Sequence, residues 1–251
     1  MRLHLAFALC ARTSWSAASD QLSLLKDTLD HVQSDIPADL RIIVQYLEGV
    51  IYQGTGSLDA ALNIFLSPSF SLPEPHKPAP SHTHLDLSIL AALNSLLITR
   101  SRTLPPFEVA PLISRLEPLC KGNPSKGILS AYNLILATIM SDDTIVHQKQ
   151  CLQNALQAAK ACLNNQLMCF TLNLMSWKFF RGVVGQQAEK SARASQSLAQ
   201  KGKDVLWTSV SAGLLADTLE IQGRPEEAEA VRAEGRRFAG ALPEAVQRLE
   251  T

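Results

Sequence analysis

Paired segments with a helical spacing of apolar residues run along the whole sequence, and signals for β-strands are nearly absent. Stretches rich in Leu, Ala and Gln recur, whereas no alternating apolar and polar run is closed by an Asn-Gly or Asp-Gly turn. The pairs begin at intervals of roughly 35 to 40 residues, which is the range of helical-hairpin repeats. We therefore predict an all-α fold, a solenoid of about six helical hairpins.

Turn-forming residues and prolines separate the helices of the predicted pairs. The expected helices span 1–12 and 15–33, 38–53 and 57–66, 85–100 and a segment ending near Cys120, 126–140 and 145–163, 166–182 and 186–200, and 204–222 and 225–240. A Pro-rich loop at 67–84 follows the second pair. No break is sharp enough to separate domains, because each hairpin buries its apolar face only against its neighbours. We expect a single TPR-like repeat domain over residues 1–251.

The composition argues against several classes of protein. Of the 251 residues, 46% are hydrophobic and 18% are charged, so the chain can bury a continuous core. The 23 Lys and Arg residues balance 23 Asp and Glu residues, which argues against a protein that grips nucleic acid through its phosphates. No apolar run approaches the roughly 20 residues that a bilayer crossing needs, so we expect no membrane span. The opening segment, Arg2 followed by LHLAFALCA, imitates a secretory signal, but we favour an ordinary helix because His4 interrupts the apolar run.

Metal, cofactor and catalytic sites are not expected. The five cysteines contain no C-x-x-C pair and indicate reduced thiols. His82 and His84, with His76 nearby, could chelate a metal on a rigid scaffold, but in a Pro-rich loop we favour solvated histidines. The sequence holds no phosphate-binding glycine loop, no G-x-S-x-G elbow and no H-E-x-x-H helix. We therefore predict a protein that is not an enzyme, has no cofactor and takes no small-molecule substrate.

The second hairpin, YLEGVIYQGTGSLDAALNIF, has a diagnostic spacing of small and aromatic residues. Its signature residues fall three, four, five and four positions apart: Gly49, Tyr52, Gly56, Ala61 and Phe65. This pattern closely resembles the tetratricopeptide repeat (TPR). We expect Gly49 and Ala61 to lie where two antiparallel helices cross, Gly56 to permit the turn, and Tyr52 and Phe65 to fill the space between hairpins.

The last hairpin, LLADTLEIQGRPEEAEAVRAEG, repeats the scheme. The matching positions are Leu215, Ala216, Leu219, Gly223 and Ala228. Arg232 stands where an aromatic residue is expected, which indicates a solvent-facing terminal repeat that packs on no successor.

Beyond the generic repeat, the chain resembles the C-terminal portion of the cohesin loading factor family, the TPR-repeat subunit of the cohesin loader. The resemblance rests on the second hairpin, on residues 152–204, which include LMCFTLNLMSWKFF, and on LWTSVSAGLLADTLEIQGRPEEAEA. It implies a superhelix that encloses an extended N-terminal segment of the loader's large HEAT-repeat subunit and helps to place cohesin on chromatin in the nucleus. Family members are much longer, so the resemblance also implies a C-terminal fragment or a truncated gene model.

Helix 166–182 and the helix after it carry the residues that we consider for partner binding. Trp177 belongs to a helix that is apolar almost all round, and it forms either a floor for a bound peptide or plain core. From residue 178 to 203, six basic residues face one acid, which fits an acidic partner, DNA phosphates or a solvated helix face. The candidate partner-binding residues are Trp177, Lys178, Arg181, Lys190 and Arg193.

A second function stays open at this point, a TPR adaptor of another complex such as a chaperone-binding module. That mode needs basic side chains converging from successive first helices, to grip an acidic carboxyl terminus. Here the basic residues concentrate in the second helix 186–200 and its flanks, which weakens the chaperone-type alternative.

Overall fold

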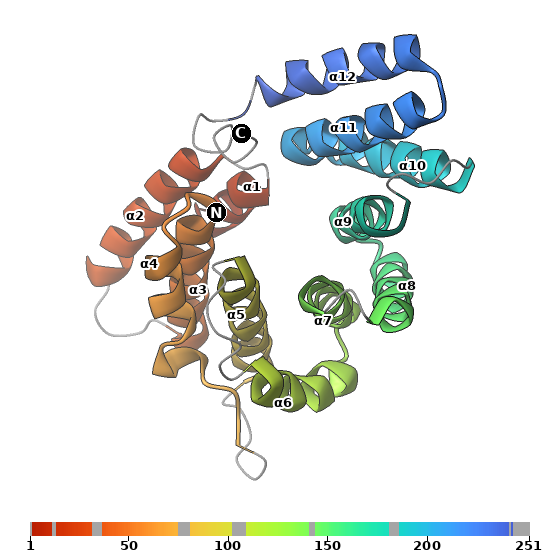
Figure 1. Cartoon of the computed structure of the whole chain (residues 1–251). Coiled ribbons are helices and arrows are strands. Elements are labelled where there is room, and N and C mark those ends of the chain that lie inside the picture. The colour runs from red at the N-terminus through yellow and green to blue at the C-terminus, as the bar shows by residue number, and fades with distance from the viewer. Residues whose placement is uncertain are drawn as a thin grey trace. The chain divides into compact units, whose positions relative to one another are not determined.

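The computed structural model describes residues 2–11, 14–31, 37–74, 81–101, 109–140, 144–180, 186–240 and 242. In this part of the chain the regular elements are helices, and none of the described residues forms a strand (Figure 1). The predicted all-α hairpin solenoid is confirmed. None of the described helices combines the length and the apolar character needed to cross a membrane.

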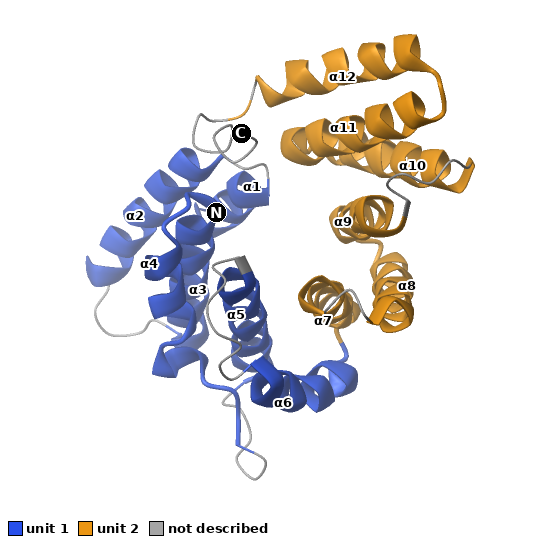
Figure 2. Ribbon diagram, viewed as in Figure 1, with its two compact units in different colours: residues 1–124 blue, residues 125–251 orange. Residues whose placement is uncertain are grey.

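The chain divides into two compact units, Met1–Pro124 and Ser125–Thr251 (Figure 2). The first unit holds α1 (Arg2–Ala11), α2 (Trp15–His31), α3 (Ala38–Gly54), α4 (Leu58–Phe65), the 3-10 turn η1 (Pro68–Phe70), α5 (His82–Ser101) and α6 (Val109–Gly122). The second holds α7 (Lys126–Ile139), α8 (Ile145–Ala161), α9 (Asn165–Met175), the π-helical turn η3 (Ser176–Phe180), α10 (Gln186–Gly202), α11 (Val205–Ile221) and α12 (Pro225–Ala239). A single domain over residues 1–251 stays a prediction, and each unit is described by itself.

Within each unit the helices pack in chain order. Every helix contacts the next one along the chain, and the first helix of a hairpin also contacts the first helix of the next hairpin: α1 with α3, α3 with α5, α7 with α9, and α9 with α11. This is the pattern of stacked hairpins, in which each pair buries its apolar faces against its neighbours.

Gly49 lies where α3 crosses α4. A Cβ atom added to Gly49 would lie 2.6 Å from Cε1 of Phe65, so the crossing accepts no side chain at this position. Ala61 and Phe65 of α4 are both buried in the core cluster of this hairpin. The Phe65 ring of α4 therefore fills the space beside Gly49 that a side chain on α3 would otherwise occupy.

Tyr52 differs from the expected packing role. It is 36% exposed, and its hydroxyl donates a hydrogen bond to Glu48, one turn away on the same helix. The buried tyrosine is Tyr46, whose ring centroid lies 5.8 Å from that of Phe65. Asn94 of α5 donates a hydrogen bond of 3.0 Å to the Tyr46 hydroxyl oxygen. Burial raises the pKa of Tyr46 to about 12, so this phenol stays neutral and bridges two hairpins.

The last hairpin has the same turn geometry as the second. Gly56 and Gly223 both have positive φ angles, +79° and +76°, which glycine adopts without steric cost. The remaining matched residues are buried in one core cluster that joins α10, α11 and α12: Leu215, Ala216, Leu219 and Ala228. Arg232 is partly exposed and forms ion pairs with Asp217, Glu220 and Glu229.

Part of the expected Pro-rich loop is structured. Phe70 and Leu72 are buried, and Arg115 of α6 donates a hydrogen bond to the Leu72 carbonyl oxygen. At its other end α5 begins at His82 and not at Leu85, because the Ser81 hydroxyl oxygen accepts the backbone N–H of His84. His82 and His84 therefore lie in a helix, whereas His76 lies outside the described residues.

Two hairpin junctions of the second unit are built alike and lie 40 residues apart in sequence. Leu163 and Lys203 have positive φ angles, 54° and 53°, and the residue after each is the N-cap of the next helix. Asn164 accepts the backbone N–H of Leu167, and Asp204 accepts that of Trp207. A left-handed residue followed by a capping side chain thus closes one hairpin and opens the next.

Leu163→Gly is expected to raise the free energy of unfolding by about 1 kcal/mol, because a leucine pays a steric cost in the left-handed region. Its side chain is 83% exposed, so little packing is lost. The matched control is Leu66→Gly, at another exposed leucine with an ordinary φ of −92°. The control should lose stability in urea melts, and a loss for both variants would contradict the expectation.

A buried polar network joins α9, α10 and α11. The side-chain oxygen of Asn173 accepts hydrogen bonds from Ser195 at 2.6 Å and Ser211 at 3.1 Å. The two hydroxyl oxygens lie 2.9 Å apart, and the Asn173 amide donates to the sulfur of Cys169. Burial raises the pKa of the Cys169 thiol, so it serves here as a neutral hydrogen-bonding group.

Candidate partner-binding surface

The segment that follows α9 turns one aromatic residue outward and one inward. In the π-helical turn η3, Trp177 is 50% exposed, whereas Phe179 packs against the core cluster of Ala137, Cys151 and Leu152. The ammonium of Lys149 lies 5.3 Å from the Phe179 ring centroid. π-Helical turns occur often at functional sites, and an exposed tryptophan is the residue type most enriched among binding hot spots.

Two further apolar residues are exposed at the same end of these hairpins. Ile145 and Val146, in the first turn of α8, are 49% and 82% exposed. One helical turn after Val146 stands Lys149, which contacts Phe179 of η3. This contact places the start of α8 beside η3, the turn that holds Trp177. We call Ile145, Val146, Lys149 and Trp177 the tip surface.

Lys178 has a structural contact. Its ammonium donates a hydrogen bond of 3.2 Å to the carbonyl oxygen of Ala137, near the C-terminal end of α7. The cation thus satisfies a carbonyl at a helix end, where the helix dipole favours positive charge. Arg181 lies outside the described residues.

Lys190 and Arg193 lie on the exposed face of α10. Arg193 is paired with Glu189 at 2.8 Å, and the second oxygen of Glu189 is held by Arg224 at 2.9 Å. Arg193, with Arg224, holds the pKa of Glu189 below its ordinary value. Much of the Arg193 charge is therefore compensated, whereas Lys190 has no ion-pair partner among the described residues.

The structure brings some of the predicted residues together and separates others. The hydroxyl of Ser176 donates a hydrogen bond of 3.2 Å to that of Ser191 on α10. Trp177 directly follows Ser176, and Lys190 directly precedes Ser191. Lys178 is directed instead toward α7. Ile145 and Val146 were not among the predicted site residues, although two large apolar residues side by side at a helix start cannot both face the core.

The tip surface consists of three exposed apolar side chains, Ile145, Val146 and Trp177, and one cation, Lys149. Among the described residues, no three His, Cys, Asp or Glu side chains gather in a way that could hold a metal ion. The buried thiols of Cys10 and Cys120 have pKa values raised by burial, to about 11 and about 12, so neither is an activated nucleophile. Such a surface can bind another protein by contact.

Comparison with known proteins gives one match. A family model described as cohesin loading factor matches residues 1–226. Searches of curated proteins and of solved structures returned no match.

Proposed function

This chain belongs to the cohesin loading factor family, and from that premise we propose that it is a non-catalytic scaffold subunit that binds the large HEAT-repeat subunit of the cohesin loader. Membership of the family gives the chain a role in cohesin loading and sister chromatid cohesion, in association with the cohesin-loading complex. Binding to the HEAT-repeat subunit and action on nuclear chromatin are the finer parts of the proposal.

The extent of the family match is the observation that carries the proposal. The matched residues 1–226 run from α1 through α11, so the likeness covers the stacked hairpins of both units and not one repeat alone. A preformed wall of helices suits a scaffold, because a partner segment can bind along it without the wall having to order itself.

The central experiment measures association of the full chain with the large HEAT-repeat subunit. We expect the two purified proteins to co-elute in gel filtration and to give a saturable binding isotherm. Separate elution, with no heat of binding, would contradict the proposal. Binding of an acidic chaperone C-terminal peptide in place of the loader subunit would favour the general TPR adaptor.

Trp177→Ala is expected to weaken binding of the large subunit about tenfold, because truncating a tryptophan anchor removes a large apolar contact. The matched control is Tyr52→Ala, at an exposed aromatic residue of the first unit that lies outside the tip surface. Calorimetric titration of both variants, with thermal melts to verify folding, checks the prediction. Equal affinities for the two variants would show that Trp177 does not contribute to binding of the large subunit.

Lys190 and Arg193 stay proposed contacts of the same kind. Their positions on α10 suit an acidic segment that continues from the tip surface. Because Arg193 also forms an ion pair with Glu189, a charge reversal at Arg193 would disturb that pair as well. A charge reversal at Lys190 tests partner binding without breaking this ion pair.

A further inference from the structure

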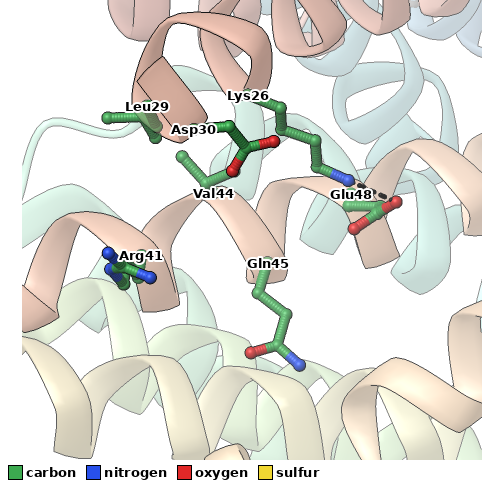
Figure 3. Close-up of a pocket in the computed structure, with 7 residues that line it drawn as sticks. All are labelled: Lys26, Leu29, Asp30, Arg41, Val44, Gln45 and Glu48. Carbon is green, nitrogen blue, oxygen red and sulfur yellow. Dashed lines mark ion pairs between the residues drawn. The ribbon is translucent and has the colours of Figure 1, made fainter. Parts of the chain in front are cut away.

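A cavity of about 210 Å³ opens between the end of α2 and the first half of α3 (Figure 3). Its apolar floor consists of Leu29 and Val44, which belong to the packed core cluster shared by α1, α2 and α3. Val44 is buried and Leu29 is partly buried. The floor is therefore fixed by the core, and the cavity does not depend on surface side chains alone.

Two interactions also fix the rim of this cavity. The ammonium of Lys26 lies 2.6 Å from a carboxylate oxygen of Glu48, which links α2 to α3 across one end. Gln45 points away from α2, and its amide donates a hydrogen bond of 3.3 Å to the Ser67 hydroxyl oxygen (Figure 3). These three side chains are already engaged.

The other two charged residues of the rim are available. Among the described residues, Asp30 on α2 and Arg41 on α3 have neither an ion-pair nor a hydrogen-bond partner for their side chains. The Asp30 carboxylate projects from α2 toward α3, and Arg41 lies about one turn before Val44 on the facing helix (Figure 3). Asp30 and Arg41, without a partner in the part of the chain that the structure describes, thus flank the apolar floor from opposite walls.

This pattern selects for a ligand that carries both charges. A ligand of a single sign would be attracted by one wall and repelled by the other, whereas a segment with separated opposite charges pairs with both. The cavity is an open groove, and small molecules favour sites that enclose most of their surface, so a protein segment fits it better.

We propose that this α2–α3 pocket binds a protein segment that places an apolar side chain on Leu29 and Val44, with an acidic residue toward Arg41 and a basic residue toward Asp30. The inference rests on the proposed function, because the partner that supplies this segment is the large HEAT-repeat subunit. It adds a contact site in the first unit, distinct from the tip surface of the second.

Photo-crosslinking in the full complex locates the contact. A photoreactive phenylalanine analogue replaces Leu29 in the pocket or, as the matched control, Leu24 on the same helix, which is exposed and does not line the cavity. We expect irradiation to join the large subunit to the chain at position 29, with at least about tenfold less product at position 24. Equal yields at the two positions would overturn the inference.

Charge reversal tests the chemistry of the pocket. Arg41→Glu and Asp30→Arg are each expected to weaken binding of the large subunit about tenfold, while Asp20→Arg, an exposed residue of α2 outside the cavity, leaves affinity unchanged. Thermal melts verify that the variants fold. If the unmodified chain binds the large subunit and both reversals bind equally well, the pocket inference fails alone. If the unmodified chain does not bind, the proposed function fails.

Discussion

Gly49→Val is expected to lower the free energy of unfolding by about 3 kcal/mol, because the crossing of α3 and α4 has no room for a side chain. The first added carbon would lie 2.6 Å from Phe65 Cε1 and 3.1 Å from Ile64 Cγ2. Phe65 cannot move aside freely, since its ring also packs against Tyr46. The helices must separate, and the separation exposes the core that they share with α5.

Gly213→Ala is the matched control for this variant. Gly213 also lies inside a helix, α11, but a Cβ atom there would have nothing within 4 Å. Alanine should therefore stabilise the chain by about 0.5–1 kcal/mol through its better helix propensity. Urea denaturation followed by circular dichroism measures both. A Gly49→Val chain as stable as the parent would show that the crossing is looser than described.

Asn173→Ala is expected to cost about 3 kcal/mol, since it creates a cavity and leaves two buried hydroxyls without their common acceptor. Ser195 and Ser211 both donate to Asn173, and all three side chains are buried. Thermal and urea melts measure the loss.

A triple variant separates the hydrogen-bond contribution from simple packing. Asn173→Leu combined with Ser195→Ala and Ser211→Ala removes donors and acceptors together while keeping apolar volume. It should recover most of the stability that Asn173→Ala loses, because replacing both partners of a buried hydrogen bond by apolar groups is nearly neutral. A triple variant less stable than Asn173→Ala would show that the network does more than satisfy its own polar groups.

The hairpins could be predicted from the sequence because their signals are local. Pro225 in the first turn of α12 is a local signal for a helix start, and Gly56 and Gly223 mark tight turns by their chemistry alone. The helix start at His82 was missed, because its signal was a single serine at the end of a Pro-rich run. The capping hydrogen bond of Ser81 thus extends the helix into a segment whose proline content predicts a loop.

The packing partners could not be read from the repeat spacing. Tyr52 occupies the signature position, yet Tyr46, six residues earlier, is the tyrosine that reaches Phe65 and Asn94. A side chain's burial depends on how a neighbouring hairpin is rotated, and spacing within one hairpin does not encode that rotation. The outward direction of Trp177 has a similar cause, since the change from α-helical to π-helical winding at Ser176 alters the face on which later residues lie.

The candidate surface was therefore only partly predictable. Trp177 and Lys190 came from composition, while the tip surface also needed Ile145 and Val146, which belong to another hairpin. The α2–α3 pocket had no signal at all in the sequence, because Asp30 and Arg41 are ordinary charged residues until the fold places them on facing helices.

The chain-order packing of the second unit sets how its stability is shared. The middle hairpin, α9 and α10, contacts both the hairpin before it, α7 and α8, and the hairpin after it, α11 and α12. The two outer hairpins are therefore each stabilised by the middle one and not by each other. Opening α12 leaves the contacts of α7 and α8 intact, and the unit can unravel stepwise from one end. A ligand that spans several hairpins would couple these steps, turning a gradual melt into a single cooperative transition at higher temperature.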